Sequence, residues 1–194
     1  MSVELVVIGA SWGGLQAVEC VLETLPGDFG AAVVIAQHRK ADSDDGRLTR
    51  LLDAHCALEV REAEDKQALN PGAVLVAPAD YHMYVEPGLV ALSVDPEVHY
   101  SRPSIDVLFG SAADAYGERA AGVVLTGANA DGAEGLRRIA SRGGVAIVQD
   151  PETAERREMP AAALAATPDA RVAALEEIGA LLIELAGTRQ ETRR

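Results

Sequence analysis

Cysteine is scarce in this sequence, and the two that it contains, Cys20 and Cys56, stand far apart. Neither has a neighbour at the spacing of a metal site, so a metal centre built on cysteine is not expected. Cys20 falls in a predicted helix and is expected to be reduced and packed. A disulfide is the less favoured alternative, because nothing in the sequence is typical of a secreted protein.

Long hydrophobic runs are also lacking, and no apolar stretch is long enough to span a bilayer. Met1-Ser2-Val3-Glu4 leads directly into a strand-like segment, without the basic region and apolar stretch of a secretory leader. We therefore expect a cytoplasmic protein that does not insert into a membrane. Positive charge is low too: 17 basic against 30 acidic residues give a net charge of −13, which disfavours nucleic acids and anionic membranes as partners.

The chain has the length of a single domain. Its 194 residues are 48% hydrophobic, which is enough to bury a sizeable core. The sequence has no repeats and no linker, so we expect one domain over residues 1–187 followed by a polar tail at 188–194. Strand-like and helix-like segments alternate, which predicts an α/β fold with three layers (α/β/α) and a mostly parallel, doubly wound sheet.

The predicted elements can be placed by their apolar patterns. Strands are expected at 5–8, 31–36, 58–61, 73–77, 121–125 and 144–148, and helices after residue 13, from 48, from 104, after 132, at 160–166 and at 172–185. Asp42-Ser43-Asp44-Asp45 can cap the second helix. An antiparallel hairpin is expected near residues 81–94, with Pro87-Gly88 in its turn, and such a hairpin usually lies at an edge of a parallel sheet.

The first strand ends in Gly9-Ala10-Ser11-Trp12-Gly13, which has the G-x-S-x-G spacing of a nucleophile elbow. A serine between a strand and a helix lies beside free backbone N–H groups that can hold an oxyanion. The motif alone is weak, because similar glycine turns bind phosphate or only let a helix pack closely on a sheet.

Two more predicted strands end in chemically capable residues, His38 and Asp131. Parallel strands place their carboxyl ends on one edge of a sheet, so Ser11, His38 and Asp131 are expected together as nucleophile, base and orienting carboxylate. Each also has a structural alternative: His38 as an ordinary loop histidine, Asp131 and Ser11 as helix caps. The coincidence of all three favours a catalytic site.

The chain order Ser–His–Asp differs from the Ser–Asp/Glu–His order of the α/β-hydrolases. The chain instead resembles the catalytic domain of the CheB-type chemotaxis protein-glutamate methylesterases. The matching stretches run in family order from residue 6 to about residue 185 and include Ile8-Gly9-Ala10-Ser11-Trp12-Gly13-Gly14, Gln37-His38, Asn70-Pro71-Gly72, Ala77-Pro78, Arg102-Pro103-Ser104-Ile105-Asp106, Leu125-Thr126-Gly127, Asp131-Gly132-Ala133, Gln149-Asp150 and Met159-Pro160.

The resemblance implies hydrolysis of methyl esters on receptor glutamates, deamidation of certain glutamines, and no cofactor or metal. Carried over, Ser11 is the nucleophile, His38 the general base and acid, and Asp131 its orienter. Backbone N–H groups of Trp12 and Ala128 would hold the oxyanion. The implied partner is the cytoplasmic helical region of a methyl-accepting chemoreceptor or a similar methylated protein. The family's receiver domain is missing from this chain, which is either a standalone member or an excised domain. Control by phosphorylation of a receiver would therefore need a separate receiver domain.

Several positions depart from the family pattern. The family usually has a small residue at Trp12, Met at Ala128, Gly at Asn129 and Met at Arg39. Trp12 either lines the substrate groove or blocks it, and Asn129 tolerates a positive φ better than most residues. Trp12, Arg39 and Arg102 are the candidate substrate-binding residues, with a structural ion pair as the equal alternative for Arg102.

Other functions stay open at this point. A divergent or inactive member could act as a protein-binding module with Trp12 filling the pocket, or the triad could cleave a different small ester. A nucleotide-binding role is disfavoured, because the glycine turn lacks G-x-G-x-x-G and Gln37 stands where a ribose-binding acid is expected.

Overall fold

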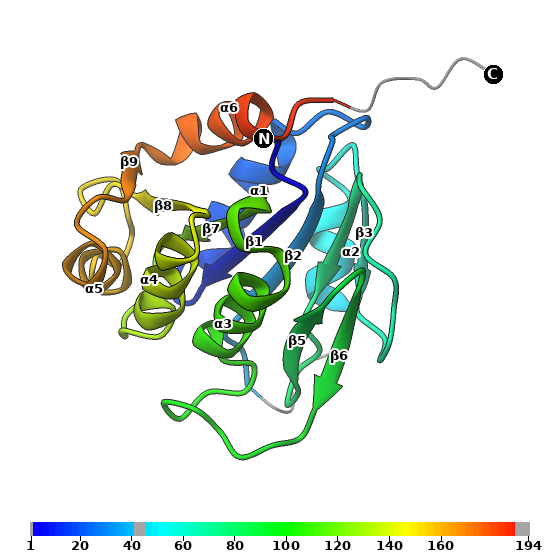
Figure 1. Cartoon of the computed structure of the whole chain (residues 1–194), viewed down its shortest axis with the longest axis horizontal. Helices are drawn as coiled ribbons and strands as arrows, with labels where there is room; N and C mark the ends of the chain where they lie inside the picture. Colours follow the sequence, from blue (N-terminus) through cyan, green and yellow to red (C-terminus); the bar gives the residue numbers. More distant parts are fainter. Residues whose placement is uncertain (1, 41–45, 189–194) are drawn as a thin grey trace.

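A seven-stranded sheet forms the centre of the protein, and helices cover both of its faces (Figure 1). The computed structural model describes residues 2–40 and 46–188. The strands of this sheet are β1 (Leu5–Ala10), β2 (Ala32–Gln37), β3 (Glu59–Glu62), β4 (Ala73–Val76), β7 (Ala120–Val124), β8 (Val145–Gln149) and β9 (Arg171–Ala173). Every strand pair in it is parallel, which confirms the predicted doubly wound α/β architecture.

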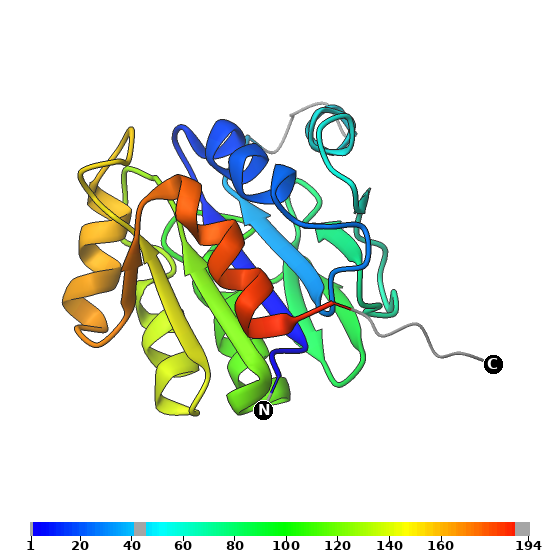
Figure 2. The same cartoon turned by 90° about the horizontal axis from the view of Figure 1, so that it is seen from above.

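The helices form the two outer layers, which Figure 2 shows from above. They are α1 (Gly14–Glu23), α2 (Arg47–Asp53), α3 (Ile105–Tyr116), α4 (Ala133–Ser141), α5 (Glu158–Ala166) and α6 (Leu175–Ala186), with a short 3₁₀ helix at Gly117–Arg119. Alternate residues of β1 point to opposite faces, so Val6 and Ile8 pack in the core with α1, α2 and α6, while Leu5 and Val7 pack with α3, α4 and α5. Because both faces are covered, β1 is buried along its whole length.

The strand order is β3-β4-β2-β1-β7-β8-β9, and β1 lies at the point where the chain changes direction across the sheet. β1 pairs with β2 on one side and with β7 on the other. Ligands of open α/β sheets bind beyond the carboxyl ends of the strands at such a point. The fold therefore places the segments that follow β1, β2 and β7 side by side where a site is expected.

The antiparallel hairpin forms a sheet of its own. It consists of β5 (His82–Glu86) and β6 (Leu89–Ser93), which pair only with each other among the described strands. The expectation that it lies at an edge of the parallel sheet is wrong, because its apolar side chains Met83, Val85 and Val90 are buried in the core on the α3 side. Its position beside α3 is visible in Figure 1.

Two further differences concern the ends of predicted elements. Val172 does not belong to the last helix but to the three-residue strand β9, and α6 begins only at Leu175. The predicted cap at 42–45 and the tail from 189 lie outside the described residues. Among the helices of residues 2–40 and 46–188, none has the length and apolarity that a bilayer crossing requires.

Gly9 allows α3 to approach the central strand closely. A Cβ on Gly9 would lie 2.3 Å from Cγ2 of Ile105, which is fully buried. We expect Gly9→Ala to lower the free energy of unfolding by about 1–3 kcal/mol, the usual cost of overpacking a core. Denaturant unfolding of both proteins measures this, and an unchanged midpoint would show that Ile105 can move at no cost.

Candidate active site

Ser11 follows β1 directly and is held by the strands on both sides. Its N–H donates to the carbonyl of Thr126 at 3.0 Å, after β7, and its carbonyl accepts from Gln37 Nε2 at 2.7 Å, at the end of β2. The same carbonyl accepts from the N–H of Gly14, where α1 begins. The turn between Ser11 and Gly14 passes through Gly13, whose φ of 75° is a left-handed conformation that favours glycine. The strand-to-helix turn therefore fixes the backbone beneath the Ser11 hydroxyl.

The Ser11 hydroxyl begins a chain of hydrogen bonds that runs through His38 to Asp131. His38 Nδ1 lies 3.2 Å from Ser11 Oγ, and His38 Nε2 lies 2.7 Å from Asp131 Oδ2. A carboxylate only accepts, so Nε2 carries the ring proton and Nδ1 presents its lone pair to the serine hydroxyl. The structure thus brings together the three residues that the strand-end argument groups, in the geometry of a nucleophile, a base and an orienting acid.

Asp131 is buried at the amino end of α3, where four donors meet its carboxylate. Oδ2 accepts from His38 and from the N–H of Ile105 at 2.7 Å, and Oδ1 accepts from Ser104 Oγ and the N–H of Asp106, both at 2.9 Å. Burial raises the pKa of this carboxyl, but the hydrogen bonds from His38, Asp106 and Ile105 outweigh burial and hold the pKa below its ordinary value. Asp131 is therefore kept ionised beside the imidazole.

A second carboxylate, Asp106, supports the loop that carries Asp131. Its Oδ1 accepts from the N–H of Gly132 at 3.0 Å and of Gly135 at 2.7 Å. Burial, followed by the neighbouring negative charge of Asp131, raises the pKa of Asp106 above its ordinary value. From the sequence, Ser104 and Asp106 are named only within a stretch that resembles the family and neither is given a role, because their contacts with Asp131 and its loop are not visible in the order of the residues.

The backbone N–H groups of Trp12 and Ala128, near Ser11, have no hydrogen-bond partner among residues 2–40 and 46–188, and neither do those of Gly13 and Asn129. The N–H of Gly127, which precedes Ala128, donates instead to the carbonyl of Arg156 at 3.1 Å. Gly127 packs directly against the serine, since a Cβ on it would lie 3.0 Å from Ser11 Cβ. The two N–H groups predicted to hold the oxyanion are thus available for a ligand.

The indole of Trp12 is turned toward the β8–α5 connection. Its Nε1 donates to Glu155 Oε1 at 2.8 Å, and the guanidinium of Arg156 lies 5.2 Å from the ring centroid. The side chain is 59% exposed and does not line the cavity beside His38. This placement favours the alternative in which Trp12 lines one side of the substrate groove over the alternative in which it blocks the groove.

We therefore expect Trp12→Thr to leave access to Ser11 almost unchanged. The rate of labelling by a small serine-directed phosphonate should change by less than about threefold, since the lost contacts are those to the exposed Glu155 and Arg156. Labelling is followed by mass spectrometry. A much faster reaction in the variant would show that the indole blocks the nucleophile.

Asn129 contacts the triad, which its expected role in the turn did not predict. Its Nδ2 lies 3.3 Å from His38 Nδ1, and its Oδ1 accepts from the N–H of Asp131 at 3.1 Å. The backbone at Asn129 does not have a positive φ, so tolerance of that conformation is not the reason that asparagine fits here. Asn129 therefore takes part in the site through its side-chain carboxamide and not through its backbone conformation.

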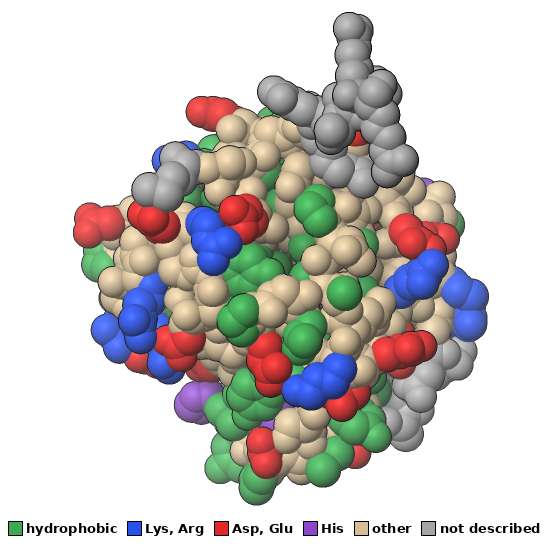
Figure 3. Space-filling model, turned by 45° about the vertical axis from the view of Figure 1, so that its right-hand side comes forward, with side chains coloured by type: hydrophobic (Ala, Val, Ile, Leu, Met, Phe, Trp, Pro, Cys, Tyr) green, Lys and Arg blue, Asp and Glu red, His purple; other side chains and the backbone are tan. Residues whose placement is uncertain are grey.

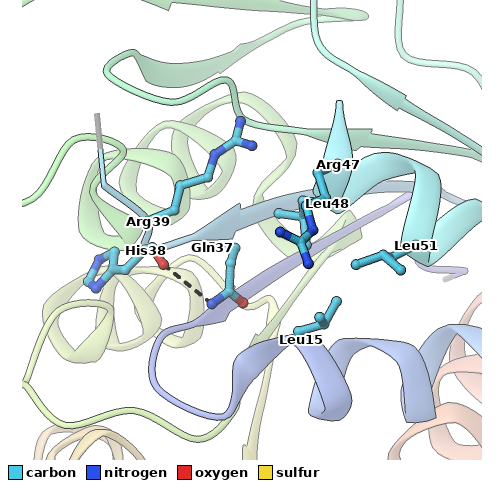
Figure 4. A pocket seen from close by; sticks show the side chains of 7 residues that line it. All are labelled: Leu15, Gln37, His38, Arg39, Arg47, Leu48 and Leu51. Atoms are coloured by element: carbon cyan, nitrogen blue, oxygen red, sulfur yellow. Dashed lines mark hydrogen bonds between the residues drawn. The ribbon is translucent and has the colours of Figure 1, made fainter. Parts of the chain in front are cut away.

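The two candidate arginines are tied to other parts of the protein. Arg39 is only 8% exposed and donates through Nη2 to Glu62 Oε2 and the carbonyl of Ala77, both at 2.9 Å. Figure 4 shows its guanidinium directed away from the imidazole of His38. Arg102 donates to Asp80 Oδ1 through Nε and Nη2, and its Nη1 donates to the carbonyls of residues 94 and 95. Both arginines thus hold loops in place, and for Arg102 the geometry is that of the structural ion pair.

A cavity of about 450 Å³ opens beside His38 (Figure 4). Its lining is Leu15, Gln37, His38, Arg39, Arg47, Leu48 and Leu51. Three leucines from α1 and α2 make it largely apolar, while His38 connects it to the triad. On the outer surface seen in Figure 3, acidic and basic side chains are interspersed. Among the described residues, no three His, Cys, Asp or Glu side chains are grouped as a metal site would need.

Comparisons with known proteins identify relatives of this chain. A statistical description of the CheB methylesterase family matches residues 6–182. A Leptospira interrogans protein, provisionally named a protein-glutamate methylesterase/protein-glutamine glutaminase, is 45% identical over the full length of both chains. The protein-glutamate methylesterase/protein-glutamine glutaminase 2 of Anaeromyxobacter dehalogenans is 44% identical over 94% of this chain and 53% of its own length, and the Myxococcus xanthus methylesterase FrzG is 39% identical over 93% and 54%.

A solved structure is similar throughout. The catalytic domain of the Thermotoga maritima CheB methylesterase superposes with a TM-score of 0.87 at 32% identity, over 95% of this chain and 100% of that domain. The chain spans about half the length of the longer relatives, FrzG among them. With the family pattern over nearly all of its residues and the fold of a solved member, the chain belongs to the CheB methylesterase family.

Proposed function

We propose that this protein hydrolyses methyl esters of glutamate side chains on chemoreceptor-type proteins and releases methanol. Membership of the CheB methylesterase family supports the reaction class. The observation that carries the proposal is the hydrogen-bonded chain from Ser11 Oγ through His38 to the buried Asp131, at the sheet edge where α/β proteins bind ligands.

The reaction has two halves. As Ser11 Oγ attacks the ester carbonyl, its proton moves to His38 Nδ1, and the oxyanion is stabilised by the N–H groups of Trp12 and Ala128. Collapse of the tetrahedral intermediate breaks the bond to the methoxy oxygen, which takes the proton from Nδ1 and leaves as methanol. A water molecule then gives a proton to Nδ1 and attacks the acyl-serine, which forms a second tetrahedral intermediate. Collapse of this intermediate breaks the bond to Ser11 Oγ, which takes the proton back from Nδ1, and frees the glutamate.

Asp131 keeps the imidazole in the tautomer that this sequence requires. It accepts from Nε2 in both halves and, being ionised, stabilises the imidazolium that forms in each. A glutamine side chain can follow the same path with ammonia as the leaving group, which accounts for deamidation by the same residues.

The proposed substrate is the cytoplasmic helical region of a methyl-accepting receptor, which places the reaction in the cytoplasm. The triad lies at an open edge of the fold, with Trp12 at one side and the leucine-lined cavity at the other. That arrangement suits an ester on a protein surface. The cavity of about 450 Å³ favours, as a second candidate, hydrolysis of a small ester with an apolar group.

The proposal is tested by incubating the intact chain with methylated receptor membranes and measuring methanol. Labelling by a serine-directed phosphonate, with the modified residue found by mass spectrometry, reports the nucleophile separately. Methanol release with labelling at Ser11 supports the proposal, and labelling together with cleavage of small apolar esters alone favours the second candidate. A folded protein that shows neither overturns the proposal and favours the protein-binding module.

A further inference from the structure

Two hydrogen-bond donors lie within reach of the same nitrogen, His38 Nδ1. Ser11 Oγ lies 3.2 Å from this nitrogen, and Asn129 Nδ2 lies 3.3 Å from it. A neutral imidazole has one lone pair on its unprotonated nitrogen, so the two donors share one acceptor. The proposed mechanism uses only the first of them, and the second has no role in it.

The orientation of the Asn129 carboxamide follows from its other partner. The N–H of Asp131 can only donate, and it points at Asn129 Oδ1 at 3.1 Å. The opposite orientation would place an NH₂ group against that N–H. Because the oxygen is fixed in this way, Nδ2 must face His38 Nδ1, and Nδ1 must accept because Nε2 is the nitrogen that donates to Asp131.

We propose that Asn129 is a positioning residue whose carboxamide donates to the Nδ1 lone pair and holds His38 as a neutral base. This inference rests on the proposed function, since it concerns the same histidine. A protonated Nδ1 would put one N–H against another, so the contact favours the neutral ring over the imidazolium. Hydrogen bonding to one protonation state shifts the equilibrium toward that state.

The contact also has a consequence for the proton that leaves Ser11. The Asn129 NH₂ group offers no acceptor, so an Nδ1 proton finds none on that side of the ring. It remains directed to the reacting oxygen, which is the leaving oxygen in the first half-reaction and Ser11 Oγ in the second. Asn129→Asp replaces the donor by an isosteric acceptor and reverses both effects.

Other charged groups also surround His38, and they stay the same when Asn129 is changed. Asp131 and, behind it, Asp106 lie on the side of Nε2. The remaining ones line the two cavities that His38 borders and are Arg39, Lys40, Arg47, Asp80, Glu97 and Arg102. A comparison between variants at position 129 therefore isolates the contribution of the carboxamide.

The experiment follows the imidazole of His38 by ¹⁵N NMR across a pH titration in the full chain, for the parent, Asn129→Ala and Asn129→Asp. We expect the midpoint to rise by about 0.5–1 pH unit in Asn129→Ala, the size of one net hydrogen bond. In Asn129→Asp it should rise further, because a carboxylate attracts the imidazolium. The acidic limb of kcat/KM should move to higher pH in step. Asn70→Ala, in an exposed turn before β4, is the matched control and should change neither.

The outcomes separate this inference from the proposed function. An unchanged midpoint in folded Asn129→Ala overturns the inference, even where the parent releases methanol and is labelled at Ser11. A raised midpoint in Asn129→Ala supports it even where no methanol is released, because the NMR titration needs no activity. The carboxylate of Asn129→Asp raises the midpoint by its charge alone, so where Asn129→Ala misfolds, Asn129→Gly is the second neutral variant and decides the test in the same way.

Discussion

Ser11→Ala should lower kcat for ester hydrolysis by about a millionfold, the effect of deleting the nucleophile from a serine hydrolase triad. The expectation follows from geometry, because Ser11 Oγ is the hydroxyl within hydrogen-bond distance of His38 Nδ1. The rate that remains comes from the oxyanion-binding N–H groups and from substrate binding. Methanol release under single-turnover conditions measures the loss, and phosphonate labelling should disappear with it.

The matched control for this variant is Ser141→Ala. Ser141 lies at the end of α4 on the exposed surface, and its hydroxyl donates only to the carbonyl of Arg138. It should retain full activity and labelling. A Ser11→Ala protein that is folded and still hydrolyses the ester would remove Ser11 from the mechanism.

Asp131→Asn should lower kcat by about ten-thousandfold while the serine and histidine stay in place. An amide at this position can present its NH₂ group to His38 Nε2, which moves the ring proton to Nδ1. The nitrogen that faces Ser11 would then carry a proton and could no longer act as a base. The measurement is the pH dependence of kcat, with circular dichroism and thermal unfolding to establish that the variant is folded.

Ser104→Ala separates the chemical role of Asp131 from the structural one. It removes the 2.9 Å bond to Asp131 Oδ1 and the weaker cap on the N–H of Val107, and it leaves the bond to His38 untouched. We expect a stability cost of about 1 kcal/mol with at most a tenfold loss of kcat. An equal loss of activity in the Ser104 and Asp131 variants would mean that the carboxylate acts mainly by holding α3.

The sequence predicted the centre of this fold well, for identifiable reasons. Parallel strands buried on both faces leave continuous apolar runs, and the residues that follow such runs must gather at one edge of the sheet. These two features alone group Ser11, His38 and Asp131 at one edge of the sheet. The strand β9 has no such signal, because a strand of three residues has too few positions for a pattern.

Side-chain pairing was much less accessible from the sequence. Arg39 and Arg102 were candidates for binding a substrate because they flank site residues, yet their partners Glu62 and Asp80 stand 23 and 22 residues away. Asn129 was interpreted through its backbone, whereas its carboxamide contacts a histidine 91 positions earlier. Such contacts depend on how loops from different strands meet, which local patterns do not record.

The three triad residues follow β1, β2 and β7, which are neighbours at the centre of the sheet. The outermost strands, β3 and β9, contribute none of them. The proposed catalysis therefore depends most on the middle of the molecule, although Glu62 of β3 also binds Arg39, the residue that follows His38. At the other margin, β9 contributes no residue to the proposed triad, so we expect insertions next to it to be tolerated better than insertions next to β1, β2 or β7.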